Sequence, residues 1–414
     1  MKSVDLVIIG GGSAGMAAAL QAKKEGISDI LILEKDECLG GILNQCIHNG
    51  FGLTEFKEEL TGPEYLWRFV DQIHEEKIPY ICNAQVIDLS KDKIIKYSKY
   101  GLVETIQAKA IVMATGCYER SAGAIQLPGD RCSGVITAGL AQKYLNIKGY
   151  MVGKRVVILG SGDIGLIMAR RLTLEGAKVI CVSEIMPYSA GLNRNIQQCL
   201  KDYDIPLYLS RTVSKVVGKN RLEKVVLSSV DENTNFIPGT EMEIECDTLV
   251  LSVGLVPYIS LLNYIDCPTS STKGAIVNNY METMIDGIFS CGNCLHVHDV
   301  VDFVTDEGRT AGHGAALYLQ HMLDNKEEIK TCPGVGVGYI VPQIISKNTN
   351  EDVTLKFRVR NPMNDQWIIV KSGNEIISKT FKPAVVPSEM ILLKLSKDKI
   401  EKIGKEIVVE LECK

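Results

Sequence analysis

The fold is decided by the stretch DLVIIGGGSAG, residues 5–15, in which an apolar strand runs directly into Gly10-x-Gly12-x-x-Gly15. In this pattern the first glycine permits a tight turn from strand to helix. The second lets the main chain approach a pyrophosphate, and the third lets the helix pack close to the strand. A following strand, residues 30–33, ends at Glu34, whose carboxylate can accept hydrogen bonds from an adenosine ribose. The stretch therefore predicts a dinucleotide-binding unit with the pyrophosphate at a helix N-terminus.

The same landmarks recur 150 residues later. A strand at 155–159 runs into Gly160-x-Gly162-x-x-Gly165, and a strand at 178–183 ends at Glu184. One such motif is weak evidence, but two in the same strand–helix–strand context are strong. We therefore predict an α/β protein with two Rossmann-like dinucleotide-binding domains. The residues directly after Glu184 are Ile185 and Met186, with no arginine to receive a 2′-phosphate, which favours NADH over NADPH in the second unit.

Two further glycine turns follow apolar strands, at Thr115-Gly116 and at Gly254. Each lies roughly a hundred residues after its nucleotide motif, where we expect a returning strand to cross beneath the bound cofactor. From Ile340 onward short β-rich runs at 353–359, 366–370, 390–395 and 407–411 predict a small β-sandwich-like module. We identify no catalytic constellation in this module. The predicted domains are a first nucleotide-binding domain at 1–119 with 267–331, a second at 120–266, and the β module at 332–414.

Composition excludes several other classes of protein. The 414 residues are 46% hydrophobic and 23% charged, as in a globular enzyme, and the net charge of −5 without a basic tract argues against a nucleic-acid partner. The sequence contains no apolar run long enough for a transmembrane helix and no evident secretory signal. Thirteen cysteines, an odd number spread over the whole chain, argue against a secreted disulfide framework. We expect a cytoplasmic protein with reduced thiols.

The two nucleotide motifs, together with TMIDGIFSCGN at residues 283–293, resemble the flavoprotein disulfide-reductase superfamily, which has two dinucleotide-binding domains. The resemblance covers residues 1–330. It implies FAD in the first unit, NAD(H) in the second, and hydride transfer between nicotinamide and flavin. The second FAD motif of that superfamily ends in an acid that binds the ribityl chain. Here that position is Asn293, which can still form hydrogen bonds.

Two other segments resemble components of enzyme complexes. Residues 114–142 are similar to the α subunits of heterotetrameric sarcosine oxidase, cyanide synthase, opine oxidase and dye-linked proline dehydrogenase, with Ser121 in place of a proline. GGILNQCIHNGFG, residues 40–52, and the β module resemble the flavoprotein that accompanies anaerobic glycerol-3-phosphate dehydrogenase. The resemblance implies an electron-transfer subunit whose partner is a second flavoprotein dehydrogenase. The alternatives are a stand-alone NADH oxidase or thiol-disulfide reductase, and a flavin scaffold whose second nucleotide (ADP, ATP or AMP) is structural.

The thiols and histidines leave the catalytic residues unassigned. Disulfide reductases carry Cys-x-x-x-x-Cys after the first acid, whereas this chain has a single cysteine there, Cys46, followed by His48. The resemblance implies that both residues lie close to the flavin. Cys46 is either a lone redox thiol or a packing side chain. Three interpretations are open for Cys291-x-x-Cys294: a redox pair, half of a metal site, or two side chains that only pack in the core. We predict no metal site.

Together with His48, His296 and His298 could donate to a flavin carbonyl or move protons. We identify no nucleophile–base pair around any of these groups. The residues expected to contact nucleotide are Gly10, Gly12, Ser13, Ala14, Gly15, Glu34, Lys35, Gly41, Ile42, Asn44, Val86, Ala114, Thr115, Gly116, Gly292 and Asn293 for FAD, and Gly160, Gly162, Asp163, Ile164, Gly165, Glu184 and Gly254 for NAD(H).

Overall fold

The computed structural model describes residues 2–323 and 327–414 and divides the chain into two compact units. The chain leaves the first unit within β9 (Cys117–Glu119) and returns within β18 (Leu255–Pro257). The predicted three-domain division stays a proposal, since this division places the C-terminal residues in the first unit. The first unit contains Met1–Asn44, Asn49–Cys117 and Pro257–Lys414, and the second contains Gln45–His48 and Tyr118–Val256.

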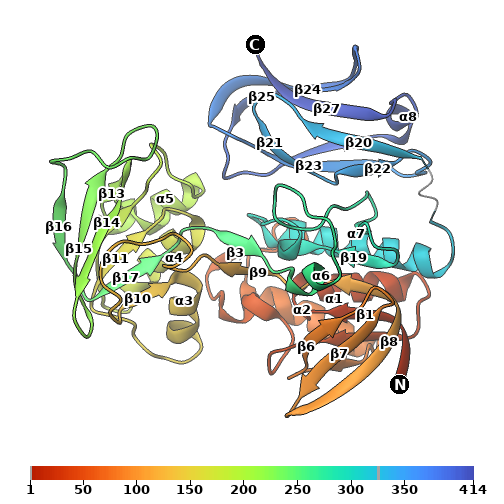
Figure 1. Cartoon of the computed structure of the whole chain (residues 1–414), viewed down its shortest axis with the longest axis horizontal. Helices are drawn as coiled ribbons and strands as arrows, with labels where there is room; N and C mark the ends of the chain where they lie inside the picture. The colour runs from red at the N-terminus through yellow and green to blue at the C-terminus, as the bar shows by residue number, and fades with distance from the viewer. Residues whose placement is uncertain (1, 324–326) are drawn as a thin grey trace. The chain divides into compact units, whose positions relative to one another are not determined.

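The first unit is built on a sheet whose described strands run in the order β5-β2-β1-β8-β7-β6, with β19 beside β8. Strands β1, β8, β7 and β6 of this sheet are labelled in Figure 1. Strand β1 pairs in parallel with β2 and β8, and its residues 6–9 are buried, as expected for a strand covered on both faces. The strands are β1 (Lys2–Ile9), β2 (Ile30–Leu33), β5 (Tyr80–Ile81), β6 (Gln85–Leu89), β7 (Ile94–Lys99), β8 (Leu102–Met113) and β19 (Ile288–Ser290), with the short pair β3 (Asn49–Phe51) and β4 (Leu60–Thr61).

Helices α1 (Ser13–Lys24) and α7 (Val301–Leu319) pack against each other at very short range. A Cβ on Gly308 would lie 2.3 Å from the carbonyl oxygen of Ala14, and a Cβ on Gly312 would lie 2.3 Å from that of Ala18. These two positions, one helical turn apart, therefore require glycine for the observed approach of the two main chains. Helix α2 (Gly62–Glu75) begins with a capping box between Thr61 and Glu64, and α6 (Ser260–Tyr264) is a single turn.

The C-terminal residues of the first unit form the expected β module around its own apolar core (Figure 1, blue). Within the described residues one sheet has the order β22-β20-β27-β24-β25 and the other β21-β23-β26. The elements are β20 (Glu328–Pro333), β21 (Val337–Val341), β22 (Ile344–Ser346), β23 (Val353–Val359), β24 (Met363–Ser372), β25 (Glu375–Val385), β26 (Ile391–Leu395), α8 (Lys397–Ile400) and β27 (Glu406–Cys413).

The second unit repeats the strand–turn–helix arrangement in a parallel sheet of order β10-β17-β11-β12-β13, beside an antiparallel sheet β14-β15-β16. The predicted fold class is thus confirmed. No helix in the described part of the chain is long and apolar enough to cross a membrane. The elements are β10 (Val135–Thr137), α3 (Ala138–Asn146), β11 (Arg155–Leu159), α4 (Asp163–Leu174), β12 (Lys178–Ser183), α5 (Asn193–Cys199), β13 (Leu207–Tyr208), β14 (Arg211–Gly218), β15 (Leu222–Ser229), β16 (Met242–Glu245) and β17 (Thr248–Leu251).

Candidate functional site

The first glycine turn lies between β1 and α1 and leaves space at the N-terminus of the helix. Gly10 has a φ of +107°, and a Cβ there would lie 2.3 Å from the carbonyl oxygen of Ala114 at the end of β8. A Cβ on Gly15 would lie 1.9 Å from the carbonyl oxygen of Gly10, whereas one on Gly12 would meet nothing within 4 Å. Gly12 therefore keeps the main chain bare beside the positive end of α1, an arrangement that fits the pyrophosphate of FAD.

Glu34 closes this turn from the end of β2. One oxygen of its buried carboxylate accepts from the Gly11 main-chain N–H at 2.7 Å, and the other accepts from that of Asp36 at 2.8 Å. These bonds hold the acid beside the glycine turn and leave lone pairs for a ribose hydroxyl. The 40–44 loop lies against the same turn, because the Gly40 N–H donates to Gly11 and a Cβ on Gly41 would lie 3.6 Å from the Gly12 Cα.

The turn of the second unit has the same construction. Gly160 has a φ of +96°, and a Cβ there would lie 2.0 Å from the carbonyl oxygen of Ser252. The Glu184 carboxylate accepts from the Ser161 N–H at 2.8 Å, from its hydroxyl at 2.7 Å, and from the Met186 N–H at 3.0 Å. Each strand-end turn predicted to lie beneath its cofactor therefore lies against the corresponding glycine turn. The two acids occupy equivalent places in the two units.

Asn293 connects the second FAD-like segment to a histidine. Gly292 precedes it with a φ of +71°, and a Cβ there would lie 2.9 Å from the Cβ of Ala14 in α1. The segment 291–294 therefore lies beside the start of α1, next to the first glycine turn. The Asn293 Oδ1 atom lies 3.0 Å from the His298 main-chain nitrogen and 3.1 Å from its Nδ1.

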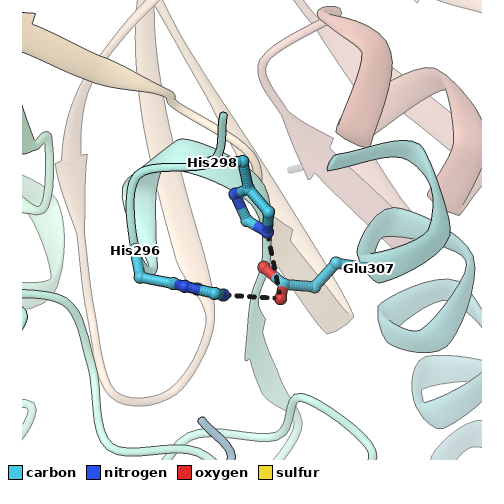
Figure 2. A group of neighbouring side chains, drawn as sticks. All are labelled: His296, His298 and Glu307. Carbon is cyan, nitrogen blue, oxygen red and sulfur yellow. Dashed lines mark hydrogen bonds and ion pairs between the residues drawn. The ribbon is translucent and has the colours of Figure 1, made fainter. Parts of the chain in front are cut away.

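Behind this segment lies a buried cluster of His296, His298 and Glu307, shown in Figure 2. One carboxylate oxygen of Glu307, Oε1, accepts from the Gly292 main-chain N–H at 2.8 Å. The other, Oε2, lies 2.8 Å from His296 Nε2 and 3.4 Å from His298 Nε2. The side chain of Glu307 is fully buried and that of His296 is 1% exposed. A carboxylate in such a place needs a compensating positive charge.

Lys356 supplies that charge from β23 of the β module. Its Nζ lies 3.1 Å from Glu307 Oε2, and its side chain is 4% exposed. Along β23 the apolar residues at 353, 355, 357 and 359 enter the core of the module, so Lys356 and Arg358 project from the opposite face. Arg358 donates to Asp299 at 3.1 Å and to the carbonyl oxygen of Val297 at 3.2 Å. The β module thus holds the segment that follows Asn293.

The charges of the cluster depend on these contacts. Burial alone would raise the pKa of the Glu307 carboxyl, but Lys356 and the two histidines hold that pKa well below its usual range. Burial lowers the pKa of His298 to about 4, against the opposing pull of Glu307. At neutral pH the cluster therefore contains an ionised carboxylate, its lysine partner and a neutral His298.

The sequence profile of the pyridine nucleotide-disulphide oxidoreductase family matches residues 4–321. The chain belongs to this family. FAD and a pyridine nucleotide are the cofactors of this family, and the two glycine turns of this chain fit them. The first turn, Glu34 and the segment 291–294 fit FAD, which supplies two-electron chemistry when bound, while the protein binds and orients it.

Comparison with individual members of the family gives moderate identities. The chain is 26% identical over 307 residues to an NAD(P)H sulfur oxidoreductase (CoA-dependent) of Pyrococcus abyssi, covering 72% of this chain and 64% of the relative. It is 26% identical over 283 residues to one subunit of the opine oxidase of Agrobacterium tumefaciens, covering 64% and 54% respectively. The chain thus spans less than two thirds of either relative. A bacillithiol disulfide reductase structure from Bacillus cereus covers 78% of this chain and 100% of its own, with a TM-score of 0.64 and 20% identity, and shares the fold.

Three cysteines of this family member, Cys46, Cys291 and Cys294, are buried and protonated where the structure places them. Burial raises the pKa of the Cys46 thiol to about 12. Cys291 and Cys294 are fully buried, which raises both pKa values, and the Cys294 thiol donates to the carbonyl oxygen of Met113 at 3.2 Å. No cysteine within residues 2–323 and 327–414 forms a disulfide. Cys46 contacts Gln142 within the second unit, and burial with nearby Arg194 and Arg170 lowers the pKa of His48 to about 4.

Three residues of this site were not predicted from the sequence: Glu307 of the buried cluster, and Lys356 and Arg358 of the β module. The sequence contained a hint of the role of Glu307. This residue directly precedes the small residues of α7 that pack on α1, and an acid is unusual in such a place. For the two cations the signal was ambiguous, since alternate polar positions on a strand usually face solvent. Of the other predicted residues, Val86 lies in the apolar core of the first unit and Lys35 is exposed. The individual cofactor contacts remain predictions.

Proposed function

We propose that this chain is an FAD-dependent NADH oxidoreductase that passes electrons between its flavin and a second flavoprotein dehydrogenase subunit. The reaction is hydride transfer between nicotinamide and flavin. The flavin then exchanges electrons with the partner and not with a cysteine of this chain. The observation that carries the proposal is the state of the thiols near the flavin motifs.

A cysteine that exchanges electrons with a flavin or a disulfide acts as the thiolate. With a pKa of about 12 for Cys46, only on the order of one thiol in 10⁵ is ionised at pH 7. Reactive cysteines in such enzymes lie beside a cation or a helix N-terminus that lowers the pKa, whereas burial is the first cause of the shift at Cys46. Cys291 and Cys294 are equally poor nucleophiles, because burial raises the pKa of each. These thiols therefore support packing roles.

The partner is supported by likeness to proteins of multisubunit enzymes. One relative is named as a subunit of opine oxidase, and residues 114–142 carry the segment through which the sequence resembles such proteins. A glycerol-3-phosphate dehydrogenase is the specific complex suggested by residues 40–52 and the β module. The substrate oxidised by the partner follows from that resemblance and belongs to the proposal.

The coenzyme is proposed to be NADH. Glu184 is buried and already accepts three hydrogen bonds, two on Oε2 and one on Oε1. A carboxylate offers about four lone-pair sites, so one acceptor site is left for a ribose hydroxyl. A 2′-phosphate would meet the same negative charge, and Ile185 and Met186, the residues that follow, carry no cation. Electrostatic repulsion therefore favours NADH.

The deciding experiment compares the isolated chain with the chain co-expressed with its genomic neighbours. We expect NADH to bleach the flavin of both preparations anaerobically, and sustained substrate oxidation to require a co-purifying flavoprotein. Cys46→Ser should leave flavin reduction by NADH unchanged, as should the matched control Cys413→Ser at an exposed site.

Two results would overturn the proposal. Turnover of NADH with a disulfide or oxygen by the isolated chain, at about 10 per second and abolished by Cys46→Ser, would establish the stand-alone reductase. Failure of NADH to reduce the flavin in either preparation would favour the scaffold with a structural second nucleotide.

A further inference from the structure

The two ring nitrogens of His298 have different partners, and the main chain decides which one carries hydrogen. The His298 main-chain nitrogen is a donor, so the Asn293 atom 3.0 Å away must be the amide oxygen. The same oxygen lies 3.1 Å from His298 Nδ1, which must therefore also donate. In the neutral ring Nε2 then carries a lone pair. That lone pair faces Glu307 Oε2 at 3.4 Å without forming a hydrogen bond.

In this buried contact two hydrogen-bond acceptors, His298 Nε2 and Glu307 Oε2, face each other. A proton on Nε2 would convert it into a charge-assisted hydrogen bond, which typically closes to about 2.8 Å. His296 makes no such unformed contact with Glu307, because its Nε2 already lies at hydrogen-bond distance, 2.8 Å, from Oε2. Its remaining nitrogen, Nδ1, has no hydrogen-bond partner among the described residues. The geometry therefore singles out His298 Nε2 as the place in the cluster where an added proton is held.

A metal ion is the other candidate for this cluster, since His296, His298 and Glu307 offer ligand atoms within 4.8 Å of one another. The Lys356 ammonium, however, already contacts the Glu307 oxygen that both histidines approach. A divalent cation bound to that oxygen would lie beside a buried positive charge, which strongly disfavours it. We therefore assign the positive charge of the cluster to Lys356 and to a proton.

We propose that His298 takes up one proton at Nε2 when the bound flavin is reduced, and that Glu307 holds this proton. The inference rests on FAD binding beside Gly292 and Asn293, as in the proposed function. NADH delivers two electrons and one proton to the flavin as a hydride and leaves as NAD⁺, so the flavin gains one negative charge. One further proton passes from solvent to His298, and the added charge near the cluster is neutralised.

The surrounding charges agree with such a role. Glu307 from α7 favours the protonated ring, whereas Lys356 from β23 and neighbouring His296 oppose it, and burial lowers the pKa of His298 to about 4. Tyr339 from β21 lies against the His296 ring. With the flavin oxidised, His298 is thus neutral at pH 7. A new negative charge nearby raises the pKa of a histidine, which makes proton uptake a consequence of reduction.

The test measures how the flavin midpoint potential of the full-length holoprotein depends on pH between 6 and 8, using reference dyes and dithionite. One extra proton per two electrons is a tenfold change in the dye equilibrium per pH unit, or about 30 mV. The midpoint potential of wild type should therefore fall more steeply with pH than that of His298→Gln, by this amount per pH unit. Glu307→Gln should also be shallower, since the proton loses its charged acceptor. His74→Gln, an exposed histidine at the end of α2, should match wild type.

Equal slopes for wild type and His298→Gln, with FAD bound to both, would overturn the proposal. If His298→Gln loses FAD, the wild-type holoprotein decides by NMR of ¹³C-labelled histidine. The His298 resonance should move to the imidazolium position on dithionite reduction at pH 7, and an unchanged resonance would refute uptake. Dithionite needs neither NADH nor a partner, so this result is separable from failure of the proposed function.

Discussion

Replacing Lys356 with methionine is expected to destabilise the first unit by about 3–5 kcal/mol at pH 7.5, the usual cost of removing one partner of a buried ion pair. Methionine retains most of the apolar stem of lysine, so the loss reports the charge more than the packing. The Glu307 side chain is fully buried and that of Lys356 is 4% exposed, so little water replaces the ammonium. The Gly292 N–H and His296 still contact the carboxylate, which favours the lower end of the range.

The effect should depend on pH with a definite sign. In wild type the pKa of Glu307 is held well below its usual range, so its contribution to stability is present above the unfolded pKa and is lost as the pH falls. In Lys356→Met the lysine no longer opposes the effect of burial, which raises the pKa of Glu307. The folded variant then binds a proton at a pH where the unfolded chain does not. The free energy of unfolding of the variant therefore increases by up to about 1.4 kcal/mol for each pH unit of acidification. The difference in free energy of unfolding between wild type and variant should become smaller as the pH is lowered from 7.5 to 5.5.

The assay is urea unfolding of the holoprotein, followed by flavin fluorescence as a probe of the first unit. Lys394→Met is the matched control, because Lys394 lies on the neighbouring strand β26 in an exposed ion pair with Asp352. Exposed pairs contribute about 0–1 kcal/mol. A loss at Lys356 no larger than at Lys394, or one independent of pH, would refute the inference that Lys356 compensates a buried charge.

The remaining predictions concern cofactor binding. FAD should be noncovalent and appear in the supernatant after acid precipitation, whereas flavin retained in the pellet would contradict this. Gly308→Ala should cost about 1–3 kcal/mol and lower FAD content, because its Cβ meets the main chain of α1; Gly123→Ala, with only an ordinary 3.8 Å contact, should not. Glu184→Ala should weaken the preference for NADH over NADPH in anaerobic titrations, and equal use of both coenzymes by wild type would refute the role of Glu184. Asn293→Asp should raise the pKa of His298 in NMR titrations, because it places a negative charge beside Nδ1; a lowered or unchanged pKa would refute this.

What the sequence predicted well depends on local constraints. Gly10 and Gly160 each lie where a carbonyl oxygen of a neighbouring strand leaves no room for a Cβ, and each is followed after 24 residues by its acid. Such turns require particular residues at fixed short spacing, so the pattern is readable without a structure. The β module was predicted for the same reason, from alternation along short strands.

What the sequence did not predict depends on packing between distant elements. Glu307 and Lys356 are 49 residues apart, on a helix and a strand that become neighbours when the β module packs on the rest of the first unit. Neither residue belongs to a motif, and Lys356 occupies a strand position that alternation assigns to solvent. The absence of a recognisable catalytic constellation in the β module therefore gave no hint that the module supplies a charge partner to Glu307. The pairing of Asn293 with His298 was likewise hidden, because it depends on how the segment after Asn293 folds back.

The position of Lys356 also limits how this protein can be shortened or recombined. The family match ends at residue 321, so an engineer would naturally cut there and keep the nucleotide-binding residues. Such a fragment would retain Glu307 in the interior while losing its cation, together with Arg358, the anchor of the segment behind Asn293. A functional fragment or chimera would have to carry the glutamate and the lysine as one exchangeable pair, or replace both with apolar side chains of similar volume.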